Sequence, residues 1–232
     1  MGADEKQLER PPWSALTTSH ARFALGDDLA RRYQRDVAPM AAIREVSEDC
    51  LHALSELMTP GDVVGLFDAK PVPAGGGLTV IMQKSIEQMV FEPGEPKAVA
   101  GAVIKLTPAD VPEMLKLVAL TQPGPFAPRT IELGAYLGIR SEGRLVAMAG
   151  ERMKFDGFTE VSGVCTHPDH RGRGHASMLV RALIHDMLER GDTPFLHIFS
   201  DTTAAAALYG KLGFARRRKL TVTVLRRDRP LQ

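Results

Sequence analysis

The stretch that decides the fold is Val164-Cys165-Thr166-His167-Pro168-Asp169-His170-Arg171-Gly172-Arg173-Gly174-His175-Ala176-Ser177-Met178. It predicts a strand end, a short turn and the start of an amphipathic helix. Gly172 and Gly174 allow a tight turn that brings backbone N–H groups together, and the unpaired N–H groups of the helix's first turn face the same way. Arg171 and Arg173 add positive charge. The segment therefore predicts a binding site for a phosphate or pyrophosphate.

This loop differs from the two common phosphate loops. It contains no Gly-Lys-Ser/Thr sequence, and Gly172-Arg173-Gly174 lacks the third glycine of a dinucleotide fingerprint. No acidic residue stands about 20 residues further on at a strand end. The pattern disfavours ATP and NAD as ligands.

The sequence around this loop predicts a mixed α/β sheet with crossover helices. The expected strands are Val99–Leu106, Tyr136–Arg140, Arg144–Met153, Glu160–Cys165, Pro194–Ser200 and Lys219–Arg226. The expected helices run from Thr107, as N-cap, to about Leu120, from Gly172 to Glu189, and from about Thr202 to Leu212.

Two motifs about 35 residues apart resemble a known family. Arg171-Gly172-Arg173-Gly174-His175-Ala176 is similar to the Arg/Gln-x-x-Gly-x-Gly/Ala signature of the GNAT superfamily of acyl-CoA-dependent N-acetyltransferases. Leu208-Tyr209-Gly210-Lys211-Leu212-Gly213-Phe214 resembles that family's Leu-Tyr-x-x-x-Gly-Phe motif. The resemblance covers roughly residues 97–227 and implies the GNAT-type mixed central sheet with flanking helices.

The resemblance implies acetyl-CoA as co-substrate, its pyrophosphate on the loop and its pantetheine arm along the preceding strand. The residues implied to contact it are Val164, Cys165, Thr166, Arg171, Gly172, Arg173, Gly174, His175, Ala176, Ser177 and Thr202. Thr202 stands where the family frequently has Asn, and Gly210 where many members have Glu. We expect Ser200 or Asp201 to supply any polar contact that Thr202 does not make.

The same resemblance implies an N-acetyltransferase in which a neutral amine of a small molecule or peptide attacks the thioester directly. Tyr209 matches the tyrosine that protonates the departing thiolate, which suits a phenol with a pKa of about 10 and a thiol of about 8.5. Glu160 matches the base position, acting directly or through a water chain. Backbone amides near Val164 would stabilise the oxyanion.

Three other interpretations have weaker support. His167, His170 and His175, with Cys165 and Asp169, match no closed zinc pattern, so we expect no metal. The basic runs 216–219 and 226–229 lack a nucleic-acid motif or interleaved aromatic residues, so we expect no nucleic-acid partner. The alternative function from a different class is a catalytically idle acyl-CoA-binding sensor or interaction module.

Composition and charge also constrain the class of protein. The 232 residues are 44% hydrophobic and 25% charged, which is typical of a globular protein, and no uncharged run is long enough to span a membrane. Residues 1–100 carry 10 Lys or Arg and 15 Asp or Glu, whereas residues 101–232 carry 19 and 13. The second half therefore suits an anionic ligand, and the net −5 of the first half hints at a cationic amine. Only two cysteines and no signal sequence predict a cytoplasmic protein.

A Pro/Gly segment at residues 91–96 predicts a seam between two parts. We expect residues 1–95 to form a smaller N-terminal α/β part and residues 96–232 a GNAT N-acetyltransferase domain. Ala21–Gln34 and Ser47–Met58 are the helices expected in the first part, and Asp62–Phe67 and Leu78–Gln83 its strands. This order faintly echoes half of the GNAT fold and resembles family members with a degenerate N-terminal copy. It would form one wall of the acceptor cleft; the amine, the acyl-chain preference and homodimer formation stay open.

Overall fold

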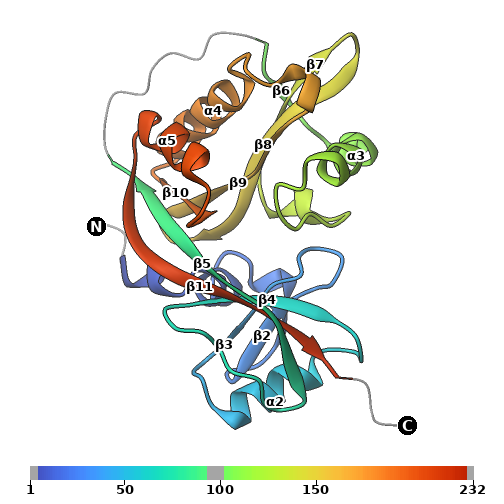
Figure 1. Ribbon diagram of the computed structural model, residues 1–232, viewed down its shortest axis with the longest axis vertical. Helices are drawn as coiled ribbons and strands as arrows, with labels where there is room; N and C mark the ends of the chain where they lie inside the picture. Colours follow the sequence, from blue (N-terminus) through green and yellow to red (C-terminus); the bar gives the residue numbers. More distant parts are fainter. Residues whose placement is uncertain (1–4, 93–101, 229–232) are drawn as a thin grey trace.

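The computed structural model describes residues 5–92 and 102–228. Its centre is an eight-stranded mixed sheet in the order β4-β11-β5-β10-β9-β8-β7-β6 (Figure 1). The strands of this sheet are β4 (Val63–Asp68), β5 (Leu78–Phe91), β6 (Ile104–Lys105), β7 (Tyr136–Ser141), β8 (Arg144–Phe155), β9 (Phe158–Thr166), β10 (Thr193–Phe199) and β11 (Phe214–Arg227). The predicted fold class, a mixed central sheet with flanking helices, is confirmed.

Helices cover both faces of the sheet. The α-helices are α1 (Pro11–Thr17), α2 (Glu48–Glu56), α3 (Val111–Thr121), α4 (His175–Glu189) and α5 (Thr203–Lys211). Successive residues of β8 alternate between the faces: Ala147 and Ala149 pack with α4, whereas Met148 packs with α3. Figure 1 shows α4 and α5 on one side of β8 and β9, and α3 on the other.

Strands from the N-terminal part complete this sheet. β5 lies between β10 and β11 and pairs antiparallel with both, and β4 pairs with the outer side of β11. Residues on both sides of the predicted seam therefore share one sheet. The seam itself lies largely outside the described residues, since only Phe91 and Glu92 of it are described.

The predicted helix over Ala21–Gln34 is wrong. A 3-10 helix (Ala21–Phe23) is followed by β1 (Ala24–Gly26) and β2 (Ala30–Tyr33), which form a three-stranded antiparallel sheet with β3 (Ala41–Ile43). Gly26 takes a left-handed φ of 109°, and the Asp27 carboxylate accepts the N–H groups of Leu29 and Ala30. This tight turn favours a hairpin over a continuous helix.

Other predicted elements agree with the structure apart from their ends. Ser47 caps α2 by accepting the Cys50 N–H, as expected of an N-cap serine. Thr107 and Asp110 form a capping box, but a 3-10 turn (Pro108–Asp110) precedes α3. β6 is two residues long, and residues 99–101 of its predicted range lie outside the described residues. Within the described chain, no helix is long and apolar enough to cross a membrane.

The remaining 3-10 turns are short connections around the sheet. They are Glu5–Glu9 at the start of the described chain, Thr130–Leu133 before β7, and Pro168–His170 between β9 and α4. The third of them carries the chain from the central sheet into the segment that the sequence singles out as a phosphate site.

Candidate functional site

The centre of the site is a divergence between β9 and β10. The two strands pair in parallel only where Phe158–Glu160 lie beside Thr193–Phe195. Beyond Glu160, β10 continues beside β5, while β9 continues beside β8. One backbone edge of β9, over residues 161–166, thus faces no described strand. Its N–H and C=O groups are available to a ligand.

A bulge shapes this edge. The pairing of β8 with β9 shifts register between Met148–Cys165 and Gly150–Ser162. Gly163 lies within the shift with a left-handed φ of 62°, which a glycine adopts at little cost. The bulge reorients the peptide groups next to Val164, where the oxyanion site was predicted.

The chain then turns into α4 through the predicted phosphate loop. Gly172 and Gly174 have left-handed φ angles of 76° and 78°. The first-turn N–H groups of α4 have no intrahelical partner, as in any helix, and Gly174, the N-cap, supplies no side-chain acceptor for them. The helix dipole is positive at this end. Loop and helix together form an anion-binding geometry.

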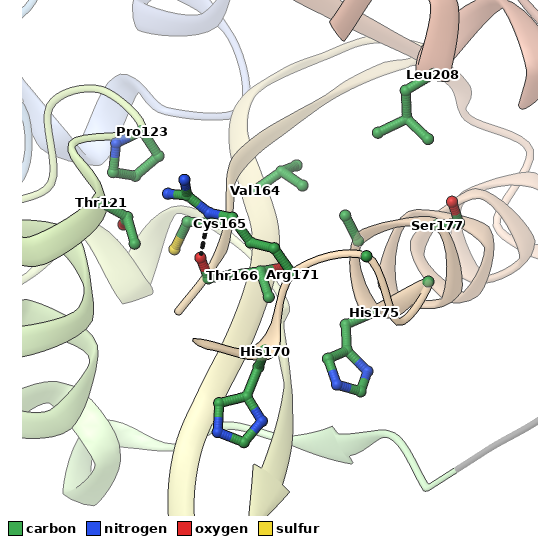
Figure 2. Close-up of a pocket in the computed structure, with 13 residues that line it drawn as sticks. Thr121, Pro123, Val164, Cys165, Thr166, His170, Arg171, His175, Ser177 and Leu208 are labelled. Carbon is green, nitrogen blue, oxygen red and sulfur yellow. Dashed lines mark hydrogen bonds between the residues drawn. The ribbon is translucent and has the colours of Figure 1, made fainter. Parts of the chain in front are cut away.

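A cavity of about 390 Å³ joins the loop to β9 (Figure 2). Its lining includes nine of the predicted contact residues: Val164, Cys165, Thr166, Arg171, Gly172, Gly174, His175, Ala176 and Ser177. The lining includes neither Arg173 nor Thr202. Arg173 bonds to the Asp169 carbonyl, and exposed Thr202 is the N-cap of α5.

The sequence interpretation missed four residues of the lining as ligand contacts: Thr121, Pro123, His170 and Leu208. Thr121 and Pro123 lie at the C-terminal end of α3, more than 40 residues before the loop, and no local pattern connects them to it. Leu208 belongs to the downstream motif, so its place beside Tyr209 was the available signal.

The polar side chains of the loop are incompletely satisfied. The Arg171 Nε–H donates to the Thr166 carbonyl at 3.3 Å, so the arginine lies across the end of β9 (Figure 2). The Nδ1 atoms of His170 and His175 are enclosed and have no partner among the described residues. Desolvation and the nearby Arg173 lower the pKa of His170. These groups retain hydrogen-bonding capacity for a ligand.

Tyr209 lies on α5, directly after Leu208, which lines the cavity. Its half-buried ring contacts Phe214 edge to face, with 5.9 Å between the ring centroids. Its hydroxyl has no hydrogen-bond partner among the described residues, and burial raises the pKa of the phenol to about 12. Tyr209, Leu208 and Val164 pack against one apolar cluster. The phenol is therefore a protonated donor that packs on the same apolar cluster as Val164 of β9.

Glu160 is enclosed by an ion pair and a hydrogen bond, and this environment disfavours its predicted role as base. Its side chain is fully buried, and both carboxylate oxygens accept from Arg152 at 2.7 Å. His197 Nδ1 donates to the same carboxylate at 2.8 Å. Despite the burial, the Arg152 guanidinium and the His197 hydrogen bond lower the pKa of Glu160 to about 2. A carboxylate held this way takes up a proton poorly at neutral pH.

The other candidate groups have structural explanations. Burial raises the pKa of the Cys165 thiol, which disfavours a nucleophilic thiolate. In the described ranges no three His, Cys, Asp or Glu side chains gather as metal ligands. The basic run near the C-terminus pairs with acids of the same chain: Arg216 with Glu87 at 2.7 Å, and Arg217 and Arg218 with Glu5 and Glu9 at 3.8 Å.

Comparisons with known proteins agree with this geometry. A family model described as FR47-like protein matches residues 136–223. An uncharacterized N-acetyltransferase of Bacillus subtilis (strain 168), YobR, is 33% identical over 61 residues, which span 26% of this chain and 25% of that protein.

Two solved structures extend the likeness to nearly the whole chain. A GCN5-related N-acetyltransferase from Kribbella flavida shares the fold at 18% identity, with a TM-score of 0.62 over 100% of this chain and 97% of its own. A putative acetyltransferase from the GNAT family of Novosphingobium aromaticivorans DSM 12444 is 36% identical, with a TM-score of 0.90 over 96% of this chain and 99% of its own. At this identity and coverage, the chain belongs to the GNAT family of acetyltransferases.

Proposed function

We propose that this protein transfers an acetyl group from acetyl-CoA to a primary amine of a small molecule or peptide, in the cytoplasm. The observation that carries the proposal is the free edge of β9 leading directly into the arginine and glycine loop of α4. An extended arm with amide groups can pair with the free edge like a strand. The pyrophosphate that follows it would then reach the N–H groups of the loop.

The residues divide the work of binding. Gly172, Gly174 and the first-turn amides of α4 would hold the pyrophosphate, with Arg171 as a charge-assisted donor. The peptide groups of β9 from Val161 to Thr166 would align the pantetheine arm. The bulge at Gly163 would direct a backbone N–H toward the thioester oxygen, where negative charge develops.

The reaction is a direct attack. The neutral amine adds to the thioester carbon, the C–S bond breaks, and the Tyr209 hydroxyl protonates the departing sulfur. Since Glu160 is enclosed in its ion pair, we propose that the amine proton leaves through water. Glu160 would then act as a positioning residue that fixes Arg152 and the adjoining end of β9.

The two parts of the chain would have different roles. We propose that residues 96–232 form the GNAT domain with the acetyl-CoA site and Tyr209. Residues 1–95 supply β4 and β5, which extend and complete its sheet, and we propose that they form one wall of the acceptor cleft. The enclosed Glu160 favours one alternative, an acyl-CoA-binding module without catalysis, and the experiments below separate the two.

The first test is calorimetric titration with acetyl-CoA. We expect micromolar binding by the wild type and at least a 100-fold loss in an Arg171→Ala/Gly174→Asp double variant, since it removes a cation and adds an anion at the loop. Arg181→Ala, on the same helix but away from the loop, is the matched control and should bind normally. Absence of wild-type binding would overturn the proposed site.

The second test is free-thiol release with a panel of primary amines. We expect Tyr209→Phe to lower kcat by about 100-fold while the Kd for acetyl-CoA stays unchanged, since the variant retains the ring and loses only the acid. Equal kcat in the variant and the wild type would refute the acid role. Binding without turnover of any amine would favour the idle module.

A further inference from the structure

The ring of Tyr136 lies across the central sheet in a space that two glycines create. Tyr136 pairs with Gly150 of β8, and a Cβ at Gly150 would stand 2.3 Å from the Tyr136 ring. On β9, a Cβ at Gly163 would lie 3.3 Å from Cε1 and 3.8 Å from the hydroxyl of the same tyrosine. Phe126 holds the ring edge to face at 5.5 Å. The phenol is thus directed at the bulge of β9.

The hydroxyl of Tyr136 has no protein partner. Although the residue is only 1% exposed, its oxygen makes no hydrogen bond with any described residue. Three side-chain atoms of the described chain are fully enclosed and have no partner: Arg31 Nε, His170 Nδ1 and His175 Nδ1. The Tyr136 oxygen differs from these atoms because it is not fully enclosed. This oxygen therefore keeps a small accessible surface. Burying a polar group without a partner is unfavourable, so an unpaired phenol at this position indicates a ligand.

Another buried phenol of the chain shows the contrast. Tyr33 is 0% exposed, and its hydroxyl hydrogen-bonds to His20 Nδ1 at 2.9 Å. Both tyrosines are desolvated, and burial raises the pKa of each phenol above its ordinary value. Of these two tyrosines, Tyr136 is the one whose hydroxyl has no hydrogen-bond partner among the described residues and lies against β9.

Tyr136 and Tyr209 approach β9 from opposite faces of the sheet. Tyr136 packs with Cys165 and the residues of α3, whereas Tyr209 packs with Val164 and the residues of α4. The predicted thioester position at the bulge lies between these two faces. If Tyr209 serves the leaving sulfur on one face, Tyr136 on the other face stays free to contact the attacking amine.

We propose that Tyr136 is an acceptor-binding residue: its hydroxyl oxygen accepts a hydrogen bond from the N–H of a neutral primary amine and directs the nitrogen lone pair at the thioester carbon. The inference rests on the proposed acetyl transfer at the same site. It assigns the residue that contacts the acceptor, which neither the family match nor the cofactor motifs identify. Since the amine stays neutral, the enclosed Glu160 carboxylate is not required to bind it as a cation.

The test is steady-state kinetics of Tyr136→Phe with 2-phenylethylamine, spermidine, glycinamide and a short peptide with a free N-terminus. For any amine that the wild type acetylates, the variant should have a raised KM for the amine and about 10-fold lower kcat/KM, the range expected for one lost hydrogen bond. The Kd for acetyl-CoA should not change. Thermal stability should be kept or raised, because the hydroxyl has no protein partner to lose.

Tyr33→Phe is the matched control, since it removes the hydroxyl of a buried phenol that is already paired with His20. It should lower thermal stability, because His20 loses a partner, and leave the KM for the amine unchanged. Wild-type activity with an unchanged KM in Tyr136→Phe would overturn the inference alone. Wild-type binding of acetyl-CoA without acetylation of any of these amines would overturn the proposed transfer and the acceptor role together.

Discussion

Two charged regions lie at opposite ends of β9 and differ in how far their polar groups are satisfied. At one end, the loop of Arg171, Gly172 and Gly174 leaves helix N–H groups and two imidazole nitrogens without partners among the described residues. At the other end, Glu160 is enclosed by Arg152 and His197, and His197 Nε2 in turn contacts the Gln88 amide at 3.2 Å.

This contrast in hydrogen bonding indicates which region of the molecule binds a ligand. A buried polar group without a partner is costly, so the unsatisfied loop is suited to an anion that supplies the missing acceptors. The cluster around Glu160 has no such demand, because every charge in it is already paired. Titratable residues in the centre of a family's usual site can thus have a structural role, and hydrogen bonding separates them from residues that bind ligand.

We call Glu160, Arg152 and His197 the closed cluster. Removing one of its charges should have the largest effect on stability. Glu160→Gln keeps the volume but leaves the Arg152 guanidinium buried without a counter-charge. We expect the free energy of unfolding, from urea titration, to fall by about 3–5 kcal/mol. Glu45→Gln is the control, since this exposed carboxylate pairs with Arg44 at 3.5 Å, and its effect should stay within about 0.5 kcal/mol.

The loop should behave in the opposite way. Arg171→Ala should weaken acetyl-CoA binding and leave the urea midpoint close to that of the wild type, since within residues 5–92 and 102–228 the side chain makes one long bond, to the Thr166 carbonyl. If instead Glu160→Gln kept full stability and lost activity alone, the closed cluster would be catalytic, and the distinction between the two regions would be wrong.

The loop was predictable because its signal is local. Gly172, Gly174 and the arginines stand within four residues, and their backbone requirements depend only on near neighbours. The role of Glu160 was not, since Arg152 stands eight residues before it and His197 thirty-seven residues after it. No sequence pattern indicates that these three side chains meet.

The same reason explains the predictions about the fold. The succession of strands along the chain from β7 to β10 followed from periodicity and turns. The insertion of β5 between β10 and β11 depends on pairing between residues more than 100 positions apart. The false helix over Ala21–Gln34 arose because alanine and arginine favour helices, while the turn at Gly26 and Asp27 decides for a hairpin.

His20 is a second buried titratable residue whose hydrogen-bonding atoms are paired, as those of Glu160 are. Its ring nitrogens bond to the Tyr33 hydroxyl at 2.9 Å and the Leu133 carbonyl at 3.2 Å, and burial lowers its pKa to about 4. In the unfolded chain the pKa is about 6.5, so the unfolded state takes up the proton first as the pH falls. Stability is full above pH 6.5 and is lost toward pH 4.

We expect the free energy of unfolding to drop by about 2 kcal/mol between pH 7 and pH 5 from this group alone. His20→Asn removes the titrating ring, so its stability should be lower at pH 7 but should fall less over the same interval. Parallel pH curves for the variant and the wild type would show that His20 does not control this range. The Kd for acetyl-CoA of His20→Asn, measured at pH 7, should match that of the wild type.

The smallest effect is expected at Arg129, which is charged and well paired like the closed cluster but lies at the surface like the loop. It bonds to both oxygens of Glu132 at 2.7 and 2.8 Å and to Asp36 at 3.2 Å, thereby linking the segment before β7 to the N-terminal part. Its side chain is 39% exposed, so water competes for every one of these bonds. Arg129→Ala should therefore cost less than about 1 kcal/mol in urea unfolding.

The segment should also keep its position in this variant, because the Thr130 hydroxyl still donates to the Val37 carbonyl at 2.6 Å. Arg144→Ala, which loses only an exposed contact to Glu142 at 3.9 Å, sets the baseline for removing a surface arginine. If the free energy of unfolding fell by more than about 2 kcal/mol relative to Arg144→Ala, Arg129 would have a structural role like that of Glu160. Full pairing alone, without burial, would then be enough to make a charged group structural in this fold.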